Sequence, residues 1–189
     1  YGIRPVTGID FRNKGTDDGL PLYIGLAKNS EGYGRLCAYL NDHQNENQPF
    51  PYSPPEIPEV SFICPWSRWK ARLTEESLEP IEGSEWIGVR PWEQSELRLM
   101  AGNTALRNRI PWERIIALHT FTFRHKRDWN CHRILRAVDR NELLSRLDKT
   151  ATGHAYDRVL SPSNFHQAFV EFPEWVKRSE AILNACAAQ

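Results

Sequence analysis

Cysteine is scarce in this sequence of 189 residues, which contains only four. They stand far apart and form no C-x-x-C pair, so nothing in the sequence indicates a disulfide framework or a zinc knuckle. Apolar runs are short, and none approaches the roughly 18 residues that a membrane-spanning helix needs. A charged and then apolar opening segment, typical of signal peptides, is missing as well. These absences predict an intracellular protein, in the cytoplasm or the nucleus, without a membrane partner.

A net charge of either sign is also lacking, because 24 lysines and arginines balance 24 aspartates and glutamates. The balance argues weakly against a general nucleic-acid binder, but the charges are unevenly distributed. Residues 104–150 contain 11 basic and five acidic side chains, whereas residues 1–103 contain 10 and 15. This basic block is either a solvated helix face or a surface for a polyanion.

Apolar residues are plentiful enough for a real core, since 40% of the chain is hydrophobic and seven residues are tryptophan. The first half alternates between strand-like and helix-like patterns, with a polar, glycine-containing connector between the first two segments, as in a hairpin. The expected elements are strands at 6–12 and 21–26, a helix over 35–43, a strand at 59–64 and a helix over 69–79.

This order predicts an α+β fold in which a small three-stranded antiparallel sheet is flanked by helices. We expect this core to occupy residues 1–95. Residues 96–189 are expected to form a C-terminal extension of mixed strands and helices that contains the basic block. Its expected elements are a strand at 115–123 and helices over 132–149 and 174–188.

Two motifs near the start of the chain resemble those of GIY-YIG nucleases. The first reads L-Y-I-G-x-A-K-N from Leu22 to Asn29, and the second reads R-L-x-x-Y-L from Arg35 to Leu40. The resemblance covers about the first 80 residues. It implies a DNA endonuclease that cleaves phosphodiester bonds with one divalent metal ion, Mg²⁺, which prefers hard oxygen ligands.

The resemblance also implies roles for individual residues. By position, Tyr23 is the second-strand tyrosine and Arg35 is the phosphate-facing arginine, whose planar guanidinium can pair two oxygens at once. Asp10, in the tripeptide G-I-D, stands where the family has its first tyrosine. Glu79 is the expected metal ligand, with Glu76 one turn earlier as its alternative. We expect these side chains to converge on a shallow, solvent-open surface.

Basic side chains interleaved with aromatic ones predict a second surface, for nucleic acid. Cations pair with phosphates, and aromatic rings such as those of Trp129 and His132 stack on bases. The alternative is a helix that covers the core with the aliphatic stems of its arginines. The residues assigned to nucleic acid are Lys28, of the first motif, and Arg124, Lys126, Arg127, Arg133 and Arg136.

Three other interpretations stay open. In the first interpretation, the chain is a catalytically degenerate GIY-YIG-like module that binds DNA or a protein partner without cutting either of them. In the second it is an NAD-dependent transferase, because residues 4–5 and 9–11 resemble the first strand of ADP-ribosylating enzymes. A weaker candidate is a metal cluster, although its spacing matches no common zinc pattern. Its members are His119, His125, Cys131 and His132.

Overall fold

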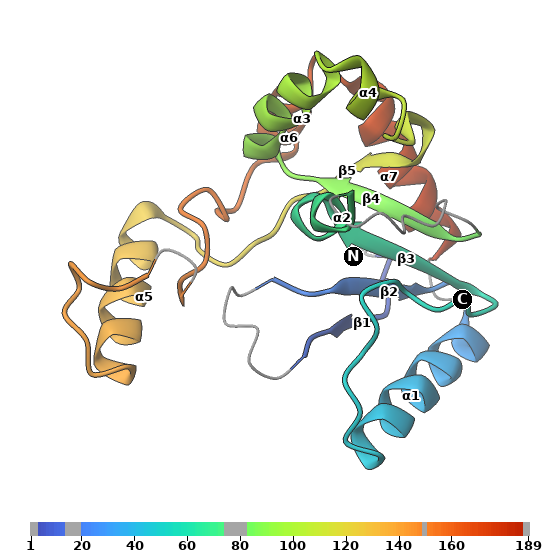
Figure 1. Ribbon diagram of the computed structural model, residues 1–189, viewed down its shortest axis with the longest axis horizontal. Helices are drawn as coiled ribbons and strands as arrows, with labels where there is room; N and C mark the ends of the chain where they lie inside the picture. Colours follow the sequence, from blue (N-terminus) through green and yellow to red (C-terminus); the bar gives the residue numbers. More distant parts are fainter. Residues whose placement is uncertain (1–3, 14–19, 74–82, 149–150, 187–189) are drawn as a thin grey trace.

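A mixed five-stranded sheet lies at the centre of the computed structural model, which describes residues 4–13, 20–73, 83–148 and 151–186 (Figure 1). The strand order is β1-β2-β3-β4-β5. The first three strands are mutually antiparallel, whereas β3, β4 and β5 run parallel. The strands are β1 (Gly8–Phe11), β2 (Tyr23–Ala27), β3 (Val60–Pro65), β4 (Glu85–Val89) and β5 (Ile115–Ala117).

Helices cover both faces of this sheet. None of those in the described ranges is long and apolar enough to cross a membrane. The α-helices are α1 (Ser30–Asn45), α2 (Trp66–Leu73), α3 (Gln94–Ala101), α4 (Thr104–Arg107), α5 (Lys126–Asp139), α6 (Pro162–Ala168) and α7 (Pro173–Ala185). The 3₁₀ helices are η1 (Pro91–Glu93) and η2 (Trp112–Arg114).

The predicted α+β class is confirmed, but the expected three-stranded antiparallel sheet is wrong. After β3 the chain crosses over through α2 and returns as β4, parallel to β3, and β5 then pairs with β4. β4 is a five-residue strand whose central residues are buried, so its sequence lacks the alternation that marks a half-exposed strand. The sheet therefore continues beyond residue 95, through a β5 of only three residues.

The predicted helix after β2 is confirmed and begins earlier than expected, because Asn29 caps it. The Asn29 side chain accepts a hydrogen bond from the backbone N–H of Gly32 at 2.9 Å. A Cβ on Gly32 would lie 2.2 Å from the carbonyl oxygen of Glu59, so only glycine allows this approach of α1 to β3. Leu36 then packs fully buried against the sheet.

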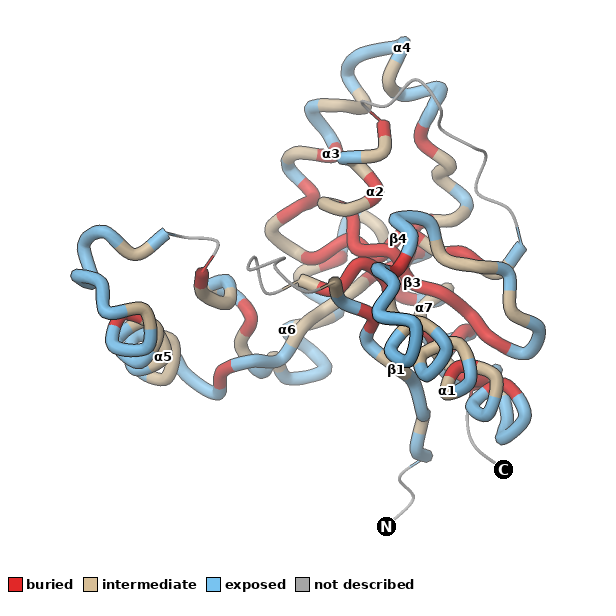
Figure 2. The backbone as a smooth tube through the Cα atoms, turned by 60° about the horizontal axis from the view of Figure 1, so that its bottom comes forward, coloured by how far each residue is buried: buried red, intermediate tan, exposed pale blue. Residues whose placement is uncertain are grey.

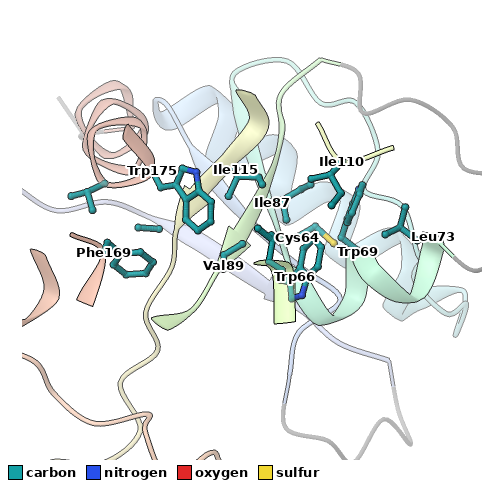
Figure 3. Close-up of a cluster of buried hydrophobic side chains, with 13 residues drawn as sticks. Cys64, Trp66, Trp69, Leu73, Ile87, Val89, Ile110, Ile115, Phe169 and Trp175 are labelled. Atoms are coloured by element: carbon teal, nitrogen blue, oxygen red, sulfur yellow. The ribbon is translucent and has the colours of Figure 1, made fainter. Parts of the chain in front are cut away.

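Buried side chains form clusters on both faces of the sheet. On one face, which we call the α1 face, α1 covers β1–β3 around Tyr23. On the same face α2 and α3 cover β3–β5, where Trp175 of α7 joins the cluster (Figure 3). The indoles of Trp66 and Trp69 stack there, with ring centroids 5.4 Å apart. On the opposite face, the α7 face, Ile182 of α7 packs on Ile63 and Ile116.

Helix α5 projects away from the sheet, on the side opposite to α1 (Figures 1 and 2). Ala137 is its one buried residue. The predicted helix over 132–149 is wrong in its bounds. The helix begins at Lys126, where the Asp128 carboxylate accepts the N–H of His125 at 2.8 Å, and it ends at Asp139. Asn141, with φ of 52°, then turns the chain away.

Candidate functional site

Tyr23, the residue expected on an open surface, is completely buried on the α1 face. Its ring lies 5.3 Å from that of Phe11 and 5.6 Å from that of Phe62. Its hydroxyl lies 3.1 Å from the hydroxyl of Tyr39 in α1. Burial and this hydrogen bond both raise the pKa of Tyr23 far above its ordinary value. The expectation of a solvent-open Tyr23 is therefore wrong, and its phenol stays protonated.

Asp10 lies on the opposite face of the sheet from Tyr23. In the β1–β2 register, Asp10 is opposite Ile24 and Phe11 is opposite Tyr23. Opposed residues share a face and successive residues alternate, so the expectation that Asp10 shares a surface with Tyr23 is wrong. The Asp10 carboxylate accepts hydrogen bonds from Nε and Nη2 of Arg12, at 3.0 and 2.6 Å.

Arg35 also bonds within its own element. Its Nη2 donates to Oε1 of Glu31, one turn earlier in α1, at 2.7 Å. This pair is largely exposed, so it constrains the guanidinium only weakly. Glu76 and Glu79, the expected metal ligands, lie outside the described residues, so their placement beside Arg35 stays a prediction.

The described residues do not assemble a magnesium site. Across the ranges that the structure describes, no three histidine, cysteine, aspartate or glutamate side chains come together as metal ligands do. Asp10 does not fit as a ligand, because Arg12 already binds both of its carboxylate oxygens. The expected cluster of His119, His125, Cys131 and His132 is likewise not brought together.

Arg124, Lys126 and Arg127 form an exposed cationic group at the N-terminal end of α5. We call these three residues the α5 cations. No ion pair or side-chain hydrogen bond of theirs occurs within the described part of the chain. The positive end of the helix dipole adds to their field. This group can therefore bind an anion without first breaking an internal contact.

The two other arginines of α5 have structural contacts instead. The guanidinium of Arg133 lies over the ring of Trp129, 4.8 Å from its centroid. Arg136 donates from Nε to the carbonyl oxygen of Ala151 at 2.9 Å and from Nη1 to Asp139 at 2.8 Å. The predicted nucleic-acid residues of the basic block thus divide into three uncommitted cations and two committed ones, Arg133 within α5 and Arg136 to the segment that follows it.

Lys28, the remaining residue assigned to nucleic acid, lies far from α5. It directly precedes the cap of α1, and α1 and α5 lie on opposite sides of the molecule (Figure 1). There it lines a groove of about 790 Å³ together with Glu59 and Arg178. The structure therefore does not bring Lys28 and the α5 cations onto one surface.

An aromatic group that the sequence patterns did not indicate lies where β4 ends. Trp92 of η1 stacks on His154, with ring centroids 4.6 Å apart and planes 8° from parallel. Tyr156, which is 57% exposed, lies 5.4 Å from His154. Arg90 lies 5.1 Å from the Trp92 centroid and pairs with Glu93 at 2.6 Å. We call Trp92, His154 and Tyr156 the aromatic platform.

The platform and the α5 cations are connected through a short backbone pairing. Phe123, next to Arg124, forms a parallel bridge with Arg158, and its N–H bonds to the carbonyl oxygen of Asp157 at 2.9 Å. Partial burial against Trp92 lowers the pKa of His154, and this effect outweighs the nearby Asp157, which raises it. Only Trp92 carried a sequence signal, because it comes shortly after β4 and residues that follow parallel strands gather at one edge of a sheet. His154 and Tyr156 come from the segment between α5 and α6, which no sequence pattern places there.

Helix α5 also carries an apolar ridge, formed by Ile134 and Leu135 on one turn and Val138 on the next. These side chains are 52%, 66% and 74% exposed. The ridge continues the helical spacing of Cys131, which is exposed too. A helix that leaves its apolar stripe uncovered is typical of a contact surface for another macromolecule.

No family model matches this chain, and no curated protein matches it. The likeness to GIY-YIG nucleases therefore depends on the two short motifs and on the order of the first five elements. Arg4, on which the transferase interpretation depends, donates to Asn184 of α7 at 2.9 Å.

Proposed function

We propose that this chain is a nucleic-acid-binding module that contacts nucleic acid through the N-terminal end of α5. Its first five elements have the order that the resemblance to GIY-YIG nucleases implies. The observation that carries the proposal is the exposed, uncommitted state of the α5 cations within the described residues. Phosphate contacts made by such cations release counterions, and this supplies most of the affinity of a sequence-independent binder.

The aromatic platform supports a nucleic acid with unpaired bases. Exposed aromatic rings beside cations suit single strands, because bases stack on the rings while the backbone follows the charge. Tyr156 and His154 are the exposed members of the platform. We therefore propose that single-stranded DNA binds more tightly than a duplex of the same sequence, whose bases are already stacked on one another.

Fluorescence anisotropy with a labelled 20-nucleotide single strand and the matching duplex tests this proposal. We expect saturable binding of both at low salt, with the lower Kd for the single strand. Tyr156→Ala should weaken binding of the single strand by about 1–3 kcal/mol and leave the duplex unchanged. Tyr52→Ala is the matched control, because Tyr52 is 68% exposed in the loop between α1 and β3. Flat titrations with both nucleic acids would refute the proposal and favour a protein partner at the apolar ridge.

The second candidate function is the metal-dependent endonuclease. It is favoured by the order β1-β2-α1-β3-α2, which is the order that the resemblance implies. Against it stand the buried phenol of Tyr23 and the reversed orientation of Asp10. A supercoiled plasmid incubated with Mg²⁺ separates the two functions. Nicking that is lost in both Arg35→Ala and Glu79→Gln would establish cleavage, whereas intact plasmid together with DNA binding would favour the module.

A further inference from the structure

An apolar groove of about 450 Å³ lies on the α7 face of the sheet, and its size falls within the range of small-molecule sites. It is lined by Ile24 and Leu26 of β2, which are only partly buried. Phe121 and Leu183 also line it, and they are 64% and 47% exposed. Large apolar side chains that gather in a groove and stay open to water are typical of a contact site for a ligand.

The groove adjoins the aromatic platform, and His119 is the link between them. The ring of His119 lies 4.8 Å from that of Phe121 in the groove and 6.1 Å from that of Trp92 in the platform. The backbone connects the two sites as well, because Tyr156 of the platform is followed shortly by Leu160, which lines the groove. A single strand whose bases stack on the platform can therefore place a neighbouring base in the groove.

The groove offers almost no hydrogen-bonding group to a ligand. Nε2 of His119 lies 2.7 Å from the carbonyl oxygen of Arg158, and its Nδ1 is buried out of reach. The Ser179 hydroxyl lies 2.7 Å from the carbonyl oxygen of Ala117, so its hydrogen is used. Glu180 is an exposed carboxylate, and the remaining lining side chains are apolar. Because the Glu180 carboxylate repels phosphate, the part of a strand that enters the groove is a base and not the backbone.

An apolar site of this kind distinguishes bases by their apolar surface. Burying the polar edge of a base without a hydrogen-bond partner costs free energy, so that edge stays at the mouth of the groove, in water. Thymine has a methyl group at C5, on which proteins make apolar contacts, and the other bases of DNA lack it. Removal of this methyl from water favours thymine over uracil, which is otherwise the same base.

We propose that the groove takes one unpaired base of the bound strand and selects thymine by its C5 methyl, which packs against Phe121 and Leu183. Uracil and cytosine leave that apolar surface uncovered. This inference rests on the proposed function, because it assigns a base site to a strand that the α5 cations and the platform hold. It adds to that function a preference for thymine-rich single-stranded DNA.

Two oligonucleotides that differ only in this methyl test the proposal, namely 20-nucleotide oligo(dT) and oligo(dU). In anisotropy titrations of the whole chain, the Kd for oligo(dT) should be about fourfold lower, as expected for one buried methyl. Phe121→Ala together with Leu183→Gln should bring the two Kd values close to each other, because the apolar walls that cover the methyl are removed. This double variant should keep the slope of log Kobs against log salt, since it removes no cation. The matched control is Tyr52→Ala with Leu99→Gln, at positions that are 68% and 79% exposed, and it should keep the original ratio.

Methyl NMR of the unmutated protein provides a readout that needs no variant. The methyl signals of Ile24 and Leu183 should shift more with oligo(dT) than with oligo(dU), whereas those of Leu99 should shift with neither. Flat titrations with both oligonucleotides would overturn the proposed function and this inference together. Saturable binding with equal Kd values, or a ratio of Kd values that the double variant leaves unchanged, would overturn this inference and leave the proposed function standing.

Discussion

The hydroxyls of Tyr23 and Tyr39 lie 3.1 Å apart inside an aromatic cluster that encloses Tyr23 completely. Burial is the main cause that raises the pKa of both phenols. A phenol that is protonated and enclosed cannot act as a general base toward water, and it cannot contact a phosphate group. The tyrosine of the L-Y-I-G motif is thus a core residue of the α1 face.

Removing the Tyr23 hydroxyl should cost stability but not binding. In Tyr23→Phe we expect the free energy of unfolding to fall by about 1 kcal/mol, because Tyr39 loses its buried partner. The double variant with Tyr39→Phe should cost less than the sum of the single variants, since both ends of the hydrogen bond are then gone. Urea unfolding measures these differences. A loss of DNA affinity in folded Tyr23→Phe would show that the phenol takes part in function.

Arg72 and Glu85 form a largely buried ion pair whose loss should lower the free energy of unfolding. Their side chains are 11% and 10% exposed, and Nη1 lies 2.6 Å from Oε1. The bond to Glu85 raises the pKa of Arg72 even though burial opposes it. We expect Arg72→Met to lower the free energy of unfolding by about 3–5 kcal/mol, because Glu85 keeps a buried, unpaired charge. Arg72→Met with Glu85→Leu should recover much of this loss, and no recovery would contradict the assignment.

The four cysteines should differ strongly in reactivity. Burial raises the pKa of the Cys64 thiol to about 12, and burial also raises that of Cys186. Cys131 is exposed on α5. Mass spectrometry after brief iodoacetamide treatment should find Cys131 labelled first, and Cys64 and Cys186 labelled only after unfolding. Labelling of Cys64 as fast as that of Cys131 in folded protein would contradict the core described above.

Two histidines should make stability depend on pH. Burial lowers the pKa of both His132 and His154 below the ordinary value of 6.5. The unfolded chain therefore binds protons more readily, so the stability they provide is complete above about pH 6.5 and is lost as the pH falls. Tm should decrease from pH 7.5 to 5.5, and the double variant His132→Gln, His154→Gln should flatten this decrease. The control His166→Gln, at an exposed position of α6, should follow the unmutated protein.

The first half of the fold could be predicted because its signals are local. β2 and α1 follow from a strand pattern, the Asn29 cap and the helical spacing of Leu36 and Tyr39. β4 could not be found in the same way, because it lies between two other strands and is buried along most of its length. Its sequence therefore lacks the alternation of polar and apolar residues that marks a half-exposed strand. Helix α5 was misplaced because its start depends on the capping contact of Asp128, not on periodicity.

The candidate site was harder to predict because it depends on tertiary contacts. Alternation places Tyr23 and Asp10 on opposite faces only once the β1–β2 register is known. That the face of Tyr23 is closed depends on Tyr39 and Phe50, which come from a helix and a distant loop. The basic residues at the start of α5 are evident in the sequence, but sequence could not show which arginines are already bound, and their nucleic-acid contacts stay a prediction.

The salt dependence of single-strand binding tests most directly whether the α5 cations contact phosphates. Anisotropy titrations at three salt concentrations give the slope of log Kobs against log salt for each variant. Replacing Arg124, Lys126 and Arg127 by alanine should flatten this slope by about 2, since each single-strand phosphate contact contributes about 0.7. The control removes the same charge from α4, from the turn that follows it and from α7, at Arg107, Arg109 and Lys177, and should keep the original slope. Equal slopes in both triple variants would contradict binding through α5.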